Sequence, residues 1–389
     1  MAAFPIGASA TLEELDADPH PLLARLRESE PVSWLPALDG WLVTSRELAL
    51  LVMRDADTFT VDDPRFSTAQ VVGPSMLSLD GTEHARHRDP FARPFRLAPV
   101  RERFTELVAL ETERLIDAFE PDGEVELRRS FAGPLSVAIV AHALGLGDTD
   151  AAEVLAWYDA IVSAVTDVTA GGAVPETGRA AFEELRLNVE RALERNPETS
   201  LVAAAAHTGE LTSAEVVSNA AVLMFGGIET TEGMIANALL HLLEAPKERA
   251  LVEGDPTLLP NAVEESLRLE PAAAVIDRYA TRDVELGGAS IPRGDLVTVS
   301  IAGANRDPAT FPDPDRFDVR RENARLQVAF AHGPHVCIGM HLARMEAHVA
   351  IGRLLARLPG VRLACQTAPS GLVFRKPARL DVSWGEVAA

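Results

Sequence analysis

The run Phe330-Ala331-His332-Gly333-Pro334-His335-Val336-Cys337-Ile338-Gly339 decides how this chain of 389 residues is interpreted. A loop that contains glycine leads into Cys337, and a helical pattern over residues 340–358 begins directly after it. A cysteine at the start of a helix receives backbone N–H donors and faces the positive end of the helix dipole, and both favour the thiolate. Gly333 and Gly339 let the backbone approach a flat, bulky group closely. The segment therefore predicts a thiolate at Cys337 beside such a group.

Two other interpretations of this segment stay open. A lone cysteine is often a small buried hydrophobic residue. Zinc is the second alternative, because four possible ligands lie within ten residues. Zinc ligands usually come as two separated pairs, and four ligands this crowded would strain the tetrahedral geometry. The four are His332, His335, Cys337 and His341.

The segment resembles the haem-binding signature of the cytochrome P-450 family. The resemblance implies haem b as the cofactor and Cys337 as the axial ligand of its iron. A thiolate on haem iron pushes electron density onto bound oxygen and favours O–O cleavage. Ala331 stands where the family more often has glycine. The signature positions in this chain are Phe330, Gly333, His335, Cys337 and Gly339.

Residues 216–243 are almost uniformly apolar and form a stretch far longer than an average helix. A membrane span is disfavoured because the polar residues 229–232 at its centre would be costly in lipid. The stretch therefore predicts a buried central helix. Gly226 and Gly227 each cost about 1 kcal/mol relative to alanine, which predicts a local distortion or a close backbone approach to a ligand. Tight packing between helices is the alternative.

Residues 226–231 resemble the family's oxygen-activation motif. The resemblance implies that Gly226 borders the haem pocket, that Glu229 is the acid of a proton relay and that Thr230 is its alcohol. An acid–alcohol pair can carry protons from solvent into an apolar pocket, which agrees with this assignment.

Glu265 and Arg268 resemble the family's Glu-x-x-Arg motif. Their spacing places both side chains on one helix face, where they can pair. Alone, such a pair is usually a solvated salt bridge worth under about 1 kcal/mol. The resemblance instead implies a buried structural network, which residues 305–308 and 311–317 would complete.

The two propionates of haem require cationic partners where they are buried. The resemblance assigns four residues to this role, although Gly81 and Thr82 replace the family's usual pair of prolines. The implied contacts are His84, Arg88, Arg278 and His335.

Composition restricts the class of protein. The 58 acidic and 36 basic residues give a formal charge of −22, which argues against nucleic acid and anionic membranes as partners. Only two cysteines occur, so a disulfide framework is excluded and a reducing compartment is favoured. The first eleven residues lack a basic region followed by an apolar run. We therefore expect a cytoplasmic protein.

The fold expected from these observations is mainly α, with a minor β portion. No linker, repeat or charge block marks a boundary, so residues 1–389 are expected to form a single cytochrome P-450 domain. The resemblance implies the family's triangular helical prism with a small β-rich lobe. Strands are predicted at 32–34, 41–43, 284–286, 296–299 and within 361–384, and a long loop at 57–80.

The implied function is a haem-thiolate monooxygenase that inserts one oxygen atom from O2 into a small or medium apolar molecule, in bacterial secondary metabolism or catabolism. No flavin or nicotinamide motif is present, so electrons are expected from ferredoxin and ferredoxin reductase. Alternatives are oxidative coupling, nitration or peroxide-driven oxidation, a haem-thiolate sensor and a zinc protein. The residues expected to line the substrate pocket are Phe59, Val61, Phe66, Val72, Met76, Val222, Leu223, residues 272–276 and residues 372–374.

Ferredoxins are acidic, so a chain with a charge of −22 needs a local basic surface to receive one. The segment 84–103 is rich in arginine, and further arginines follow Cys337. We expect a docking surface on the Cys337 side of the molecule. Its predicted members are Arg86, Arg88, Arg93, Arg96, Arg101, Arg103, Arg344, Arg353 and Arg357.

Overall fold

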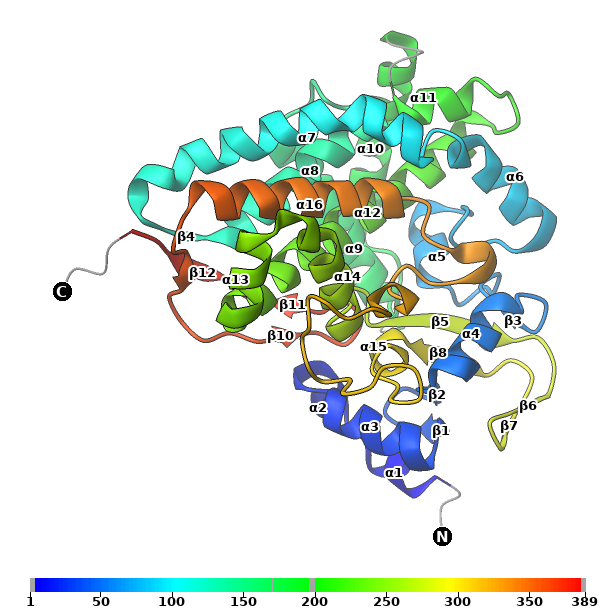
Figure 1. Cartoon of the computed structure of the whole chain (residues 1–389). Helices are drawn as coiled ribbons and strands as arrows, with labels where there is room; N and C mark the ends of the chain where they lie inside the picture. The colour runs from blue at the N-terminus through cyan, green and yellow to red at the C-terminus, as the bar shows by residue number, and fades with distance from the viewer. Residues whose placement is uncertain (1–3, 170, 196–199, 386–389) are drawn as a thin grey trace.

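The computed structural model describes residues 4–169, 171–195 and 200–385. The predicted mainly helical architecture with a minor β portion is confirmed (Figure 1). The α-helices of the described part are α1 (Pro5–Ser9), α2 (Leu12–Ala17), α3 (His20–Ser29), α4 (Arg46–Arg54), α5 (Ser67–Val72), α6 (Gly81–Ala92), α7 (Leu97–Phe119), α8 (Gly133–Leu144), α9 (Ala151–Thr169), α10 (Glu176–Arg195), α11 (Leu201–Ala206), α12 (Ser213–Glu244), α13 (Pro246–Gly254), α14 (Leu259–Leu269), α15 (Ile301–Asn305) and α16 (Met340–Arg357).

The central helix α12 confirms the helix predicted over residues 216–243. It begins with a capping box, in which the Thr212 side chain accepts from the Glu215 N–H and the Glu215 carboxylate accepts from the Thr212 N–H. At about 1.5 Å per residue it is roughly 48 Å long, and it reaches across the molecule. Among the described residues, no helix is both long and apolar enough to span a membrane.

The two glycines of α12 differ in their surroundings. The helix is continuous through both, so the predicted distortion is wrong. A Cβ on Gly227 would lie 2.5 Å from Val140 Cγ2 of α8, so close helix packing requires glycine there. A Cβ on Gly226 would meet no atom within 4 Å, because that residue faces a cavity.

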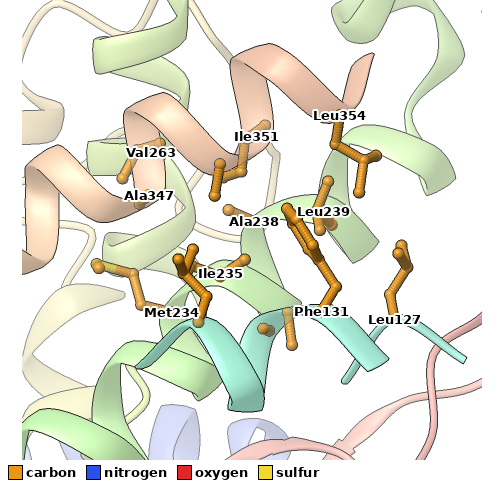
Figure 2. Close-up of a cluster of buried hydrophobic side chains, with 14 of the residues drawn as sticks. Leu127, Phe131, Met234, Ile235, Ala238, Leu239, Val263, Ala347, Ile351 and Leu354 are labelled. Carbon is orange, nitrogen blue, oxygen red and sulfur yellow. The ribbon is translucent and has the colours of Figure 1, made fainter. Parts of the chain in front are cut away.

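The largest part of the core lies where α12 packs against α14, α16 and the segment before α8. Figure 2 shows side chains from these elements converging, including Phe131, Ile235 and Ile351. All three are fully buried. Apolar burial of this kind contributes about 25 cal/mol per Å², so this contact holds the two long helices α12 and α16 in a fixed relation.

The main sheet has the order β1-β2-β8-β5-β3, and β2 and β8 pair in parallel while the other pairs are antiparallel. All the strands predicted from the sequence are present. The strands of the described part are β1 (Val32–Leu35), β2 (Gly40–Val43), β3 (Phe59–Thr60), β4 (Glu124–Glu126), β5 (Val275–Ala280), β6 (Val284–Leu286), β7 (Ala289–Ile291), β8 (Leu296–Ser300), β9 (Arg362–Leu363), β10 (Pro369–Ser370), β11 (Lys376–Pro377) and β12 (Asp381–Ser383).

Residues 57–80 are not the uninterrupted loop that the sequence suggested. β3 pairs with β5, and α5 forms a short helix that ends at Gly73. Gly73 has a φ of 82°, which glycine adopts without strain. The irregular part is therefore shorter than predicted and lies on either side of α5.

Glu265 and Arg268 form the predicted buried network. Glu265 Oε2 accepts from Arg268 Nε at 2.7 Å, and neither side chain is exposed to solvent. Arg268 also donates to the carbonyls of Asn305, Pro314 and Arg316. Arg321, which the sequence did not indicate, donates to Glu265 Oε1 at 2.9 Å. The network ties α14 to the irregular segment that precedes Cys337.

Candidate active site

Cys337 lies in a tight turn between Phe330 and the start of α16. Its N–H donates to Phe330 O at 2.8 Å, which closes the loop. Gly333 has a φ of 76°, and a Cβ there would lie 2.4 Å from Met53 O of α4. The glycine therefore lets the loop pack directly on α4, which fixes the position of Cys337.

The Cys337 thiol faces a cavity and is otherwise enclosed by protein. Burial raises its pKa, while the N–H groups of Gly339 and Met340 and the charges of Arg88 and Arg344 lower it. The N–H groups and the arginine charges favour the thiolate form of Cys337, which is the form that binds a metal ion. The expected helix N-terminus is present, because α16 begins at Met340 with Gly339 as its N-cap.

The cavity has a volume of about 270 Å³ and an apolar lining. Phe330 and Gly339 border it beside Cys337, and the Phe330 ring lies 4.5 Å from the Arg344 guanidinium. The side chains and backbone that line the cavity are Met76, Leu77, Arg88, Phe95, Val140, Ala143, Leu144, Val222, Leu223, Gly226, Gly227, Thr230, Thr231, Met234, Leu267, Ala272, Ala273, Ile276, Ile301, Ala329, Phe330, Ala331, His335, Val336, Cys337, Ile338, Gly339, Leu342, Ala343 and Glu346.

The predicted pocket is only partly correct. Met76, Val222, Leu223 and three of the residues 272–276 line the cavity. The other predicted residues, Phe59, Val61, Phe66, Val72 and 372–374, do not line it. Phe59, Val61 and Val72 are buried in the interior instead, because β3 and α5 turn them away from the cavity.

Cationic side chains gather around His335, which lines the cavity. His335 and Arg88 line it, and the His84 ring lies 4.3 Å from the His335 ring. Arg278 is 5% exposed, projects from β5 and donates only to Asp277 O. Within the described residues, neither Arg88 nor Arg278 has an ion pair with a carboxylate. Buried, unpaired arginines point to a missing anionic group.

His84 supplies a second sign of that missing group. Its Nε2 atom is buried without a hydrogen-bond partner in the described structure. Burial, together with the charges of His335 and Arg88, lowers its pKa to about 4. Of the four predicted residues, only His335 and Arg88 line the cavity, while His84 and Arg278 lie behind them near His335. The set fits the two propionates of a haem, because it holds one buried ring nitrogen and two buried arginines without an acidic partner in the described structure.

Asp80 was not assigned a role from the sequence. It accepts from His335 Nε2 at 2.8 Å, from Thr60 Oγ1 at 2.6 Å and from the Val61 N–H. These donors hold its pKa below the ordinary range despite burial. Asp80 therefore orients the His335 ring through its Nε2 atom. Its place directly before α6 was the only signal in the sequence.

The structure separates the surroundings of Glu229 and Thr230. Thr230 lines the cavity, and its hydroxyl donates to Gly226 O at 2.5 Å. Glu229 does not line it, because successive helical residues point about 100° apart. Glu229 Oε1 lies 2.7 Å from Lys376 Nζ, and Oε2 accepts from the Tyr158 hydroxyl.

A charge network surrounds Glu229 and was missed by the sequence analysis. Lys376 Nζ also contacts Glu232 Oε2 at 2.6 Å, and Arg128 Nε contacts Glu232 Oε1 at 2.6 Å. Burial and then the charge of Glu229 raise the pKa of Tyr158, so its hydroxyl stays protonated. These partners lie on α9, β11 and the π-helical turn before α8, which no local spacing could reveal.

Glu346 on α16 is a further unpredicted residue of the cavity. It is 2% exposed, and its Oε2 atom has no hydrogen-bond partner in the described part of the chain. Burial raises its pKa well above the ordinary value, which favours the neutral acid in the lining.

The zinc alternative finds no support in the geometry. Within residues 4–169, 171–195 and 200–385, no group of three or more histidine, cysteine, aspartate or glutamate side chains is arranged to hold a metal ion. His335 is turned toward Asp80, so the four candidate ligands do not converge on one point.

Comparisons with known proteins agree with this site. The sequence profile of the cytochrome P-450 family matches residues 255–359. The chain is 36% identical to cytochrome P-450 monooxygenase PikC of Streptomyces venezuelae, over 93% of this chain and 88% of that protein. It is also 36% identical to nocardicin C N-oxygenase of Nocardia uniformis subsp. tsuyamanensis, over 98% of each. The crystal structure of CalO2 matches with a TM-score of 0.87 and 30% identity, over 96% of this chain and 99% of that one.

Proposed function

Because this chain belongs to the cytochrome P-450 family, we propose that Cys337 is the axial thiolate ligand of its haem iron and that the cavity receives an apolar organic substrate. The chain has the cytochrome P-450 fold and is a cytochrome P-450 monooxygenase with haem as its cofactor. It uses O2, a small-molecule substrate and redox partners. We extend this to residues 1–389 as a single domain.

The observation that carries the assignment is the position of Cys337. Its sulfur borders the cavity, receives two N–H groups from the start of α16, and lies near Arg88 and Arg344. When bound, the haem supplies the activation of O2, which a thiolate ligand promotes. His84, Arg88, Arg278 and His335 would hold its propionates.

Thr230 and Glu229 are proposed to handle protons. The Thr230 hydroxyl gives its own proton to Gly226 O, so its oxygen lone pairs remain available to the cavity. Glu229 is kept outside the cavity by Lys376 and Tyr158. When Glu229 leaves Lys376, that cation stays paired with Glu232, so release does not strand a buried charge.

The lining indicates the substrate class. Apart from Arg88, His335, Cys337, Thr230, Thr231 and Glu346, the lining residues are apolar. Gly226 leaves open space at the centre of α12. We propose a small or medium apolar molecule, oxidised in bacterial secondary metabolism or catabolism. The relatives named as a monooxygenase and an N-oxygenase support oxygen insertion into an organic molecule by similarity.

Ferredoxin, reduced by ferredoxin reductase, is the proposed electron donor. The basic surface is narrower than predicted: Arg344 pairs with Glu264, Arg353 with Glu113, and Arg357 with Glu113, Asp117 and Glu120. Arg86 pairs with Glu83 and Glu215. Of the predicted members, Arg93, Arg96 and Arg101 are exposed and have no ion pair in the described structure, and we call these three the α7 arginine surface because they lie at or near the start of α7.

We propose a cytoplasmic location for the protein. Cys337 and Cys365 are both free. Thiols that are not bridged are typical of a reducing compartment.

The ferrous–CO spectrum tests the proposed ligand. Thiolate ligation should give the strongly red-shifted Soret band, and Cys337→Ala should abolish it. Cys365→Ala is the matched control, because this exposed thiol touches only Asp381, and it should leave the band unchanged. A spectrum typical of histidine-ligated haem in the unsubstituted protein would contradict the proposal.

A further inference from the structure

One buried amide joins three walls of the cavity. Asn219 lies in the second turn of α12 and is fully buried. Its Oδ1 accepts from the Met76 N–H at 2.8 Å, and its Nδ2 lies 3.0 Å from His87 Nδ1. Met76 and Leu77 line the cavity, while His87 shares α6 with His84 and Arg88.

The two backbone partners of Asn219 determine the orientation of its amide. Nδ2 donates to Glu215 O at 2.8 Å, and Oδ1 must face the Met76 N–H. Nδ2 is therefore also the group that faces His87, so His87 Nδ1 accepts and the ring carries its proton on Nε2. Burial lowers the pKa of His87, which favours this neutral form.

The loop around Met76 packs in the apolar core, but few other hydrogen bonds attach it to a helix. Its internal bonds, from Ser75 N to Ser78 Oγ and from Ser78 N to Ser75 O, stabilise the turn but do not attach it to a helix. Gly73 lies directly against Ser218 of α12 without a hydrogen bond between them. The hydrogen bond from the Met76 N–H to Asn219 therefore holds this turn at a fixed distance from α12.

We propose that Asn219 is a positioning residue that holds the Met76–Leu77 turn in place and thereby sets the size of ligand the cavity admits. Replacing the amide by an apolar group of similar size leaves the Met76 N–H and His87 Nδ1 without partners. The turn then loses its fixed distance from α12. Bulky ligands gain room, while small ones, which do not reach the turn, bind as before.

Hydrogen exchange of the holoprotein tests the anchor itself. In Asn219→Leu, the Met76 amide should exchange about tenfold faster or more, because its bond is lost. Asn219→Asp keeps an acceptor for this amide, so its protection should be retained. Asn237→Leu is the matched control: it is equally buried on α12, but it donates to Glu270 O and Arg375 O, so Met76 should be unaffected. Unchanged Met76 exchange in Asn219→Leu would overturn the proposal.

Azole binding to the ferric protein tests the effect on ligand size. The ratio of the Kd of 4-phenylimidazole to that of imidazole, measured from the Soret shift, should fall at least about threefold in Asn219→Leu and stay constant in Asn237→Leu. An unchanged or increased ratio in Asn219→Leu would overturn the specificity role. This second measurement rests on the proposed haem site. Failure of all variants to bind azoles would contradict that site and leave the exchange test to decide on the anchor.

Discussion

Thr230 and Glu229 are neighbours in the sequence but lie in different surroundings. Thr230 borders the cavity, whereas Glu229 is held by Tyr158 and Lys376 on an adjacent face of α12. A proton that travels from solvent to the cavity would therefore pass from a charged, partly solvated network to a hydroxyl in an apolar space. This arrangement would keep the charged groups that supply protons out of the space that binds substrate.

Removal of the Thr230 hydroxyl should break that route without disturbing the substrate. We expect Thr230→Ala to keep its substrate affinity while product formed per NAD(P)H consumed falls about tenfold or more, with peroxide accounting for the difference. Thr230→Ser, which keeps the hydroxyl, is the matched control and should retain most of the coupling. An unchanged ratio in Thr230→Ala would remove this residue from the mechanism and favour coupling or peroxide-driven chemistry.

At the scale of elements, α14 and the irregular segment after α15 are held together by charge. Glu265 accepts from both Arg268 and Arg321, and Arg268 is otherwise saturated by backbone carbonyls. The segment it fixes leads directly to the Cys337 loop. A change that weakens this network should therefore lower both the stability of the irregular segment and the retention of haem.

Glu265→Ala should strand two buried cations and lower the free energy of unfolding by about 3–5 kcal/mol, with loss of bound haem. Glu264→Ala is a suitable comparison, because Glu264 is the neighbour of Glu265 on α14 and pairs with Arg344, which is partly exposed and can turn to solvent. Denaturant titration and haem content measure both effects. Glu265→Ala protein that is as stable as Glu264→Ala and fully loaded would show that the network is not structurally important.

The elements were easier to predict than the contacts between them. Helix α12 was predictable because its apolar residues are continuous and its length exceeds that of most helices. Helix α5 was not, since six residues bounded by Gly73 carry too little periodicity. Cys337 and its neighbours were found because they are close in sequence. Lys376 was missed because its partner Glu229 lies on a distant element, and such pairs are created only by packing.

The whole molecule combines a charge of −22 with a small basic area. The α7 arginine surface is exposed and free of ion pairs in the described structure, and Arg101 is close enough to His341 to lower its pKa. It therefore lies beside the start of α16, which carries the Cys337 loop. An acidic protein would be attracted to the α7 arginine surface and repelled by the acidic remainder of the molecule.

Reversal of one charge on this surface should slow electron transfer. At low salt, Arg96→Glu should reduce the rate of reduction by ferredoxin about tenfold, and rising ionic strength should narrow the difference because screening acts over about 8 Å at physiological salt. Arg293→Glu makes the same change in net charge beyond β7, which Figure 1 places well apart from α7. Equal rates for the two variants would show that the partner docks elsewhere.

The pairing of Lys376 has a practical consequence for chemical labelling. The chain contains only two lysines, and Lys376 is buried between Glu229 and Glu232 while Lys247 is exposed on α13. A reagent selective for lysine amines would therefore attach a dye or a solid support through a single side chain, in one defined orientation. A label found on Lys376 itself would report that its ion pairs with Glu229 and Glu232 had opened.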